Sequence, residues 1–159
     1  MRKRQITPTR QSAEPSNQAW LDMGRNVLVE VTSEERVCPI ESAVLPEQNE
    51  NRGWRAADPG TQTIRLIFDE PQTLRRIWLI FEGTENTRTQ EFVLRWSPGP
   101  GCSFREIVRQ QWNFSPSGSV REIEDYTVDL SEVAVLELTI VPDKADREAR
   151  ASLRSLRVA

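Results

Sequence analysis

The segment from Gly53 to Leu79 constrains the fold more strongly than any other part of this sequence. Apolar side chains occupy every second position over residues 64–68 and again over residues 77–81. A period of two is typical of β-strands that bury one face. Between the two runs, the residues Asp-Glu-Pro-Gln at positions 69–72 predict a tight turn. We therefore expect two consecutive strands joined by that turn, preceded by a long loop that carries Trp54.

The same alternation recurs along most of the chain in short segments separated by turn residues. The sequence shows no long amphipathic helical pattern and no repeat with a period of about 20–50 residues. Short strands with turns about every 8–12 residues are typical of β-sandwiches and barrels. We therefore predict an all-β protein, an eight-stranded antiparallel jelly-roll β-sandwich. The expected strands cover residues 27–31, 63–68, 76–81, 88–96, 104–114, 120–130, 136–140 and 156–158.

Two segments depart from simple alternation. The phase of the strand at 104–114 slips near Ile107 and Val108, which a β-bulge would explain. The irregular segment 32–61 is long for a compact domain, so we expect it to be functional or to contain a short element, for which residues 40–45 are the candidate.

The chain has the length of one domain. At 159 residues it can bury roughly two-thirds of the surface of its unfolded state. Residues 1–18 are polar and almost without apolar periodicity, so we expect a flexible, polar and basic N-terminal arm over residues 1–25 and one β-sandwich domain over residues 26–159. No signal peptide pattern follows the basic start, and no apolar run could span a membrane. We therefore expect a cytoplasmic protein without a membrane span.

The charge distribution bears on the class of partner. The net charge is -3, but residues 1–26 hold five basic and two acidic residues, so the rest holds 16 basic and 22 acidic residues. Sequence-independent binding of nucleic acid requires a basic surface that displaces phosphate counterions. The acidic body argues against a nucleic-acid partner, and the ligands that we consider are carbohydrates and proteins.

Residues for the common nucleophilic and metal-dependent mechanisms are missing. The sequence contains no His, which excludes Ser-His-Asp and Cys-His systems. Its two cysteines, Cys38 and Cys102, lie far apart, so we interpret them as buried free thiols and expect neither a disulfide nor a zinc site.

The densest acidic group comprises Glu122, Glu124 and Asp125. In a strand, Glu122 and Glu124 would point to the same face about 7 Å apart, which is near the spacing of glycosidase carboxylate pairs. The favoured interpretation is a solvated face whose charge Arg121 or Arg109 balances, with a glycosidase as a minor alternative. We expect no enzymatic activity.

Several motifs resemble the discoidin, or coagulation factor 5/8 type C, domains of the galactose-binding-like superfamily. They are Thr32-Ser33 at the end of the first strand, Trp54-Arg55 in the long loop, the strand-turn-strand pattern from Ile64 to Ile77, and the closing segment 151–158. The resemblance extends from about Asn26 to Ala159 and implies a galactose-binding-like β-sandwich.

A second, shorter similarity covers part of the same region. Residues 54–57, Trp-Arg-Ala-Ala, followed by a Gly-x-x-Thr-Ile strand, are similar to the N-terminal domain of eukaryotic single-strand-break repair scaffolds. Discoidin-like domains that hold a structural calcium often carry a Glu in the last strand, where this chain has Arg154 and Arg157. We therefore expect no cofactor.

Topology locates a candidate binding site. If successive strands run antiparallel, alternate connections emerge at the same end, which places segments 32–61, 82–88, 115–118 and 142–151 on one rim. The resemblance implies that ligands bind at this rim, and its amide, carboxylate and guanidinium groups suit a polyhydroxylated ligand. The candidate ligand-binding residues are Glu47, Asn49, Arg52, Trp54, Arg55, Glu82, Asn86 and Arg88, with Asp143 and Lys144 on the same rim.

The tryptophans have two interpretations, as core residues or as platforms on which a sugar ring stacks. Trp96 and Trp112 lie in phase with inward-facing residues, so we expect both in the core. Trp54 would plug the end of the sandwich or contact a ligand. Trp78 is out of phase, and we expect the segment around Trp20 and Leu21 to cover it.

These observations favour a non-catalytic binding module that recognises a carbohydrate through loops at one rim of the sandwich. The alternative is a protein-interaction or DNA-repair accessory module of the same fold. The sequence identifies neither the ligand nor the oligomeric state.

Overall fold

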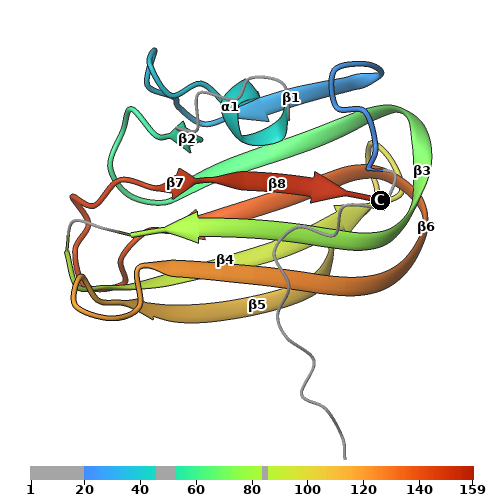
Figure 1. The fold of residues 1–159 in the computed structure, drawn as a ribbon. Helices are drawn as coiled ribbons and strands as arrows, with labels where there is room; N and C mark the ends of the chain where they lie inside the picture. Colours follow the sequence, from blue (N-terminus) through green and yellow to red (C-terminus); the bar gives the residue numbers. More distant parts are fainter. Residues whose placement is uncertain (1–19, 46–52, 84–85) are drawn as a thin grey trace, which may run out of the picture.

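The computed structural model describes residues 20–45, 53–83 and 86–159. Within these ranges the chain forms an antiparallel β-sandwich with one short helix, as predicted (Figure 1). The elements are β1 (Val27–Val31), α1 (Glu41–Val44), β2 (Trp54–Arg55), β3 (Gln62–Glu82), β4 (Arg88–Ser97), β5 (Arg105–Phe114), β6 (Arg121–Val141), β7 (Ser152–Leu153) and β8 (Ser155–Val158).

Two long strands, β3 and β6, connect the two layers of the sandwich. Each has 21 residues, and the two pair antiparallel on both sides of a shared bend (Figure 1). The first part of β3 pairs with β1, and the last part of β6 pairs with β4, which in turn pairs with β5. Beyond the bend, β3 lies between β8 and the first part of β6.

The turn predicted at residues 69–72 is therefore wrong, because these residues form a bend inside β3. The register between β3 and β6 shifts three times between Ile67 and Arg76. Pro71 lies in this stretch and has no N–H to donate to a ladder. In β6, Glu132 lies opposite the bend with a φ of 57°, in the left-handed region. The predicted strands 120–130 and 136–140 are likewise two halves of β6.

Two local predictions are confirmed. The pairing of β4 with β5 shifts in register where Leu94 faces Val108 and Arg95 faces Glu106, so Ile107 is the extra residue of a bulge. Helix α1 is the short element expected at 40–45, and Ala43 and Val44 are buried. None of the helices in the described ranges has the length and apolar character that a membrane crossing requires.

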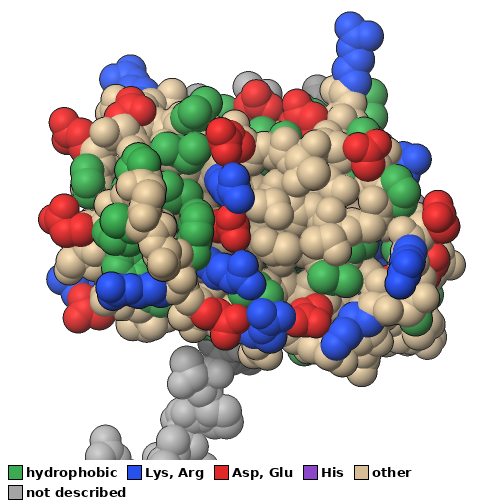
Figure 2. Space-filling view, turned by 180° about the vertical axis from the view of Figure 1, so that it is seen from behind, with side chains coloured by type: hydrophobic (Ala, Val, Ile, Leu, Met, Phe, Trp, Pro, Cys, Tyr) green, Lys and Arg blue, Asp and Glu red, His purple; other side chains and the backbone are tan. Residues whose placement is uncertain are grey.

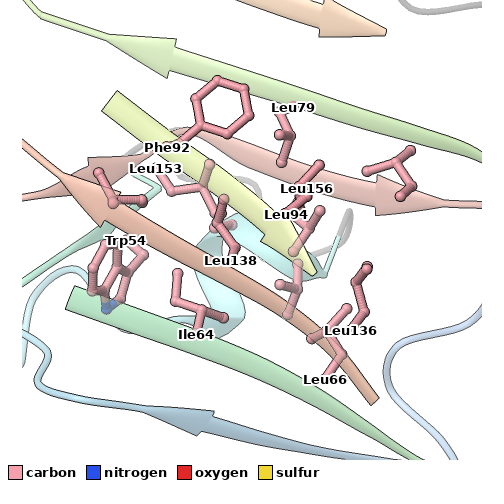
Figure 3. Close-up of a cluster of buried hydrophobic side chains, with 14 of the residues drawn as sticks. Trp54, Ile64, Leu66, Leu79, Phe92, Leu94, Leu136, Leu138, Leu153 and Leu156 are labelled. Carbon is pink, nitrogen blue, oxygen red and sulfur yellow. The ribbon is translucent and has the colours of Figure 1, made fainter. Parts of the chain in front are cut away.

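The core fills the space between the layers (Figure 3). Alternate residues of β3, β4 and β6 point inward because successive side chains of a strand project to opposite faces. Phe81 of one layer stacks on Phe92 of the other, with ring centroids 5.1 Å apart. Labelled core residues in Figure 3 are Trp54, Ile64, Leu66, Leu79, Phe92, Leu94, Leu136, Leu138, Leu153 and Leu156.

The described part of the predicted arm packs against the domain. Leu21 donates its backbone N–H to the carbonyl of Val158, and Met23 is buried. The ring of Trp20 lies 6.2 Å from that of Trp78, which is buried, so the expected cover over Trp78 is confirmed. The packed domain thus includes residues 20–25, and the remainder of the predicted arm lies outside the described residues.

The back of the molecule carries charges of both signs. On the outer face of the layer that contains β1, β4 and β5, Arg65 Nε lies 2.8 Å from Glu137 Oε2, and Arg95 lies 3.9 Å from the other oxygen of Glu137. Figure 2 shows acidic and basic side chains next to each other across this side, with apolar side chains gathered at one end. The back of the molecule therefore presents no uniformly basic surface of the kind that nucleic acid requires.

Candidate ligand-binding pocket

A pocket of about 440 Å³ lies at one end of the sandwich, where three connecting segments meet. These are segments 32–61, 82–88 and 142–151, three of the four that the sequence places on one rim. The lining residues are Cys38, Trp54, Arg55, Glu82, Gly83, Asn86, Arg88, Asp143, Asp146, Glu148, Ala149, Arg150 and Ser152.

Five of the eight predicted ligand-binding residues line this pocket. They are Trp54, Arg55, Glu82, Asn86 and Arg88. Glu47, Asn49 and Arg52, the other three, lie outside the described residues. Asp143, also predicted on the rim, lines the pocket as well.

The sequence-based list missed most of the contribution of the segment that precedes β7. Asp146, Glu148 and Arg150 line the pocket, and so does Ser152. This segment was assigned to the rim, but a sequence does not show which of its charged side chains turn inward. Lys144, which was expected on the rim, instead places Nζ 3.3 Å from Glu91 on β4 and is not a lining residue.

Arg88 is held in place by its surroundings. It is the first residue of β4, and its guanidinium carbon lies 4.9 Å from the centre of the Phe114 ring on the neighbouring strand. One of its terminal nitrogens donates to the carbonyl of Glu82 at 3.3 Å. A stacked and hydrogen-bonded guanidinium loses little further freedom on binding, so Arg88 is well prepared to donate hydrogen bonds to a ligand.

Arg55 and Arg150 converge on one carboxylate. Arg55 Nε lies 3.5 Å and Arg150 Nη1 lies 3.3 Å from the same oxygen of Glu35. The backbone of Arg55 is fixed as well, because its N–H donates to the carbonyl of Cys38 and its carbonyl accepts from Glu35. These ion pairs hold segment 32–61 against the segment before β7 at the mouth of the pocket.

Trp54 forms the floor of the pocket and belongs to the core. Its side chain is 0% exposed, and its Nε1 donates to the carbonyl of Ser33 at 3.1 Å. The indole therefore supports the pocket as an end plug and offers no open face on which a sugar ring could stack. This corrects the prediction of Trp54 as a ligand-contacting residue.

The other expectations for aromatic and cysteine residues fare unequally. Trp96 packs against the core, as expected, whereas Trp112 on β5 is 36% exposed, because no further strand of the described residues pairs with that edge. Cys38 is half-buried at the pocket and Cys102 is exposed in a turn, so the prediction that both are buried is wrong. Both are free thiols.

The acidic group on β6 does not form a solvated face. Glu122 is 2% exposed, and neither of its carboxyl oxygens has a hydrogen-bond partner among the described residues. The predicted partners are engaged elsewhere, Arg121 with Glu82 and Arg109 with Glu91. A carboxyl that is closed off from solvent has no access to a glycosidic bond, which argues against the glycosidase alternative.

Gly83 allows Phe114 and Arg88 to approach the chain closely. A Cβ atom at this position would lie 2.8 Å from the Phe114 ring and 3.2 Å from a terminal nitrogen of Arg88. We expect Gly83→Ala to destabilise the fold by about 1–3 kcal/mol through overpacking, measured as a shift of the urea midpoint at constant slope. Gly99→Ala is the matched control, because a Cβ atom at position 99 would have no neighbouring atom within 4 Å. Equal stability of the two variants would show that the Phe114 ring moves aside freely.

No family model matches this sequence, and no curated protein matches it either. Solved structures do match the fold. CpGH89CBM32-5 from Clostridium perfringens, solved in complex with GalNAc-β-1,3-galactose, is 19% identical with a TM-score of 0.62, over 88% of this chain and 99% of that chain. The CBM32 of AlyQ, in complex with 4,5-unsaturated mannuronic acid, is 15% identical with a TM-score of 0.63, over 89% and 98% of the two chains.

A protein of a different kind also matches. Reduced XRCC1, solved bound to the catalytic domain of DNA polymerase β, is 13% identical with a TM-score of 0.58, over 85% of this chain and 95% of that chain. The structural likenesses thus agree with both resemblances found in the sequence. The chain has the galactose-binding-like β-sandwich fold that CBM32 modules and XRCC1 share.

Proposed function

We propose that this protein is a non-catalytic carbohydrate-binding module whose ligand occupies the pocket at the end of the sandwich. The observation that carries the proposal is the pocket itself, in which guanidinium, carboxylate, amide and hydroxyl groups from three segments converge around a buried tryptophan. Saccharides present many hydroxyl groups, each of which can donate and accept a hydrogen bond, so a mixed lining of this kind suits them. The likeness to CBM32 modules supports the proposal.

Recognition would depend on hydrogen bonds rather than on stacking. Among the described lining residues the one aromatic side chain is that of Trp54, and it is buried. Arg88 would donate to ligand hydroxyls, while Asn86 and the carboxylates would accept from them. The half-buried position of Arg88 makes its hydrogen bonds stronger than those of a fully exposed arginine.

Arg88→Ala tests the proposal most directly. We expect it to weaken binding of the best saccharide from a glycan array by roughly tenfold to a hundredfold, since a charge-assisted hydrogen bond contributes about 1.5–3 kcal/mol. Arg75→Ala is the control, because Arg75 is exposed and pairs with Asp129 outside the pocket. Calorimetric titration would measure both affinities, and near-ultraviolet circular dichroism would confirm that each variant is folded. Undiminished affinity in Arg88→Ala, or no saccharide binding by the unmodified protein, would contradict the proposal.

A protein-interaction or DNA-repair accessory role is the second candidate. The likeness to XRCC1 favours it, and so does the similarity around residues 54–57. Nicked and intact duplex DNA, tested at physiological salt beside the glycan array, would separate the two candidates. Binding of nicked DNA in the absence of saccharide binding would select the repair role.

The fold does not determine the charge of the ligand. The two CBM32 modules compared above were solved with a neutral disaccharide and with an acidic sugar. The charges that line this chain's own pocket must therefore decide which class of saccharide it favours.

A further inference from the structure

The positive charges at the pocket are largely compensated by the protein. Arg55 and Arg150 share the carboxylate of Glu35. Arg88 covers the Phe114 ring and donates to a backbone carbonyl. An anionic ligand would have to compete with these interactions for each guanidinium group.

The negative charges of the segment before β7 are not compensated in this way. In the described ranges, no Lys or Arg lies within ion-pair distance of Asp143, Asp146 or Glu148. Lys144, from the same segment, pairs with Glu91 outside the pocket. Three carboxylates therefore line the pocket without a cationic partner from the described part of the chain.

Two of these carboxylates are fixed by backbone hydrogen bonds through one oxygen. Asp143 Oδ1 accepts from the N–H of Ala145 at 3.1 Å, and Asp146 Oδ1 accepts from the N–H of Glu148 at 2.9 Å. The second oxygen of each aspartate accepts no hydrogen bond from a described residue and can receive one from a ligand. These side chains are thus oriented before any ligand arrives.

The carboxylates do not form a metal site. No group of three or more acidic or sulfur side chains in the described residues is arranged so that it could hold a metal ion. Carboxylates that are spread along the wall of a pocket suit an organic cation, because separate donors of one extended ligand can reach them. A protonated amine offers three N–H donors and a full positive charge, and acetylation removes that charge.

From this charge arrangement we propose that the pocket selects saccharides with free amino groups, such as glucosamine oligomers, over N-acetylated and uronic-acid saccharides. The inference rests on the proposed carbohydrate-binding function and specifies its ligand class. Arg88 would bind the hydroxyl groups, while Asp146 and Glu148 would receive the amines. Both carboxylates are exposed, so each contact contributes only about 0.2–1 kcal/mol.

The test compares three tetramers by calorimetric titration near pH 6 at low and physiological salt: glucosamine, N-acetylglucosamine and galacturonic acid. We expect the glucosamine tetramer to bind about tenfold more tightly than the N-acetylated one, with the ratio falling as salt screens the exposed charges. The double variant Asp146→Asn, Glu148→Gln should reduce the ratio to about one or two. The double variant Asp69→Asn, Glu70→Gln, which makes the same charge change at the bend of β3, should leave it unchanged.

The possible outcomes separate this inference from the function beneath it. Equal or tighter binding of the N-acetylated or acidic tetramer overturns the amine preference and leaves carbohydrate binding in place. A preference that falls equally in both double variants also overturns it, since a polycation would then be following the overall acidity of the protein. If a full glycan array shows no saccharide binding at all, the proposed function fails as well.

Discussion

Replacement of Trp54 by Ala is expected to lower the free energy of unfolding by about 3–5 kcal/mol. The indole is 0% exposed and packs at the end of the core beside Ile64 and Leu153 (Figure 3). Its removal leaves a cavity that the paired strands β2 and β7 cannot readily close. It also leaves the carbonyl of Ser33 without its donor. A loss of this size would consume a large part of the stability of an ordinary domain.

Two further variants separate the contributions. Trp54→Phe fills much of the cavity but cannot donate to Ser33, so we expect it to cost about 1–3 kcal/mol. Trp112→Ala is the control on an edge strand, where a side chain that is 36% exposed should cost less than Trp54 does. Urea unfolding that is followed by far-ultraviolet circular dichroism gives all three values. If Trp54→Ala is nearly neutral, the indole is not part of the core, and it becomes a candidate ligand platform again.

The contrast between these tryptophans shows what an alternating pattern predicts and what it leaves open. Trp96 and Trp112 are both in phase with inward-facing residues, and the phase is correct for both. Burial depends in addition on whether another strand covers the position. β5 has no described neighbour beyond β4, so Trp112 is partly exposed, and strand order is not encoded in the local pattern.

The bend in β3 shows a second limit. Asp69, Pro71 and the polar residues around them break the strand pattern, which is also what a hairpin turn would do. Whether the chain folds back on itself or crosses to the other layer depends on pairing with β6, far away in sequence. Since either geometry sends the chain back toward the same end, the rim prediction holds even though the turn prediction is wrong.

The pocket was predicted in its location and only partly in its composition. Antiparallel topology places segments 82–88 and 142–151 at one end, and both line the pocket. Topology does not reveal that Glu35 ties Arg55 to Arg150, because that contact joins residues 115 positions apart in the chain. The orientation of charged side chains in loops depends on such long-range contacts, which no local pattern reports.

Glu122 is the clearest case of a residue whose environment the sequence misrepresents. Its neighbours along the chain are charged, yet it projects between the two layers and is 2% exposed. Burial raises the pKa of its carboxyl to about 9, and the negative charge of Glu124 on the same face contributes to the rise. Tyr126 donates to Glu124 at 2.5 Å, and burial together with that carboxylate raises the pKa of the tyrosine hydroxyl, which therefore stays a donor. Glu122 is consequently protonated in the native protein at neutral pH.

This proton makes stability depend on pH in a defined direction. Between its ordinary pKa of 4.5 and about 9, the carboxyl is protonated in the folded state and ionised in the unfolded state. Unfolding then releases a proton, so stability falls as pH rises through this window, by roughly 1 kcal/mol per pH unit. Below the window both states are protonated, and above it both are ionised, so the contribution is constant on either side.

Glu122→Gln should abolish this dependence. Glutamine has nearly the shape of the protonated acid and cannot ionise, so we expect the variant to gain on the unmodified protein by roughly 1 kcal/mol for each pH unit from about 5 to 9. Urea midpoints measured across that range give the difference, with Glu70→Gln as an exposed control whose profile should parallel that of the unmodified protein. Glu124→Gln should lower the pKa of Glu122 and so shorten the window, because it removes the adjacent negative charge. Parallel profiles for Glu122→Gln and the unmodified protein would show that water reaches this carboxyl in the native state, and the space between the two layers at β6 would then be hydrated rather than closed.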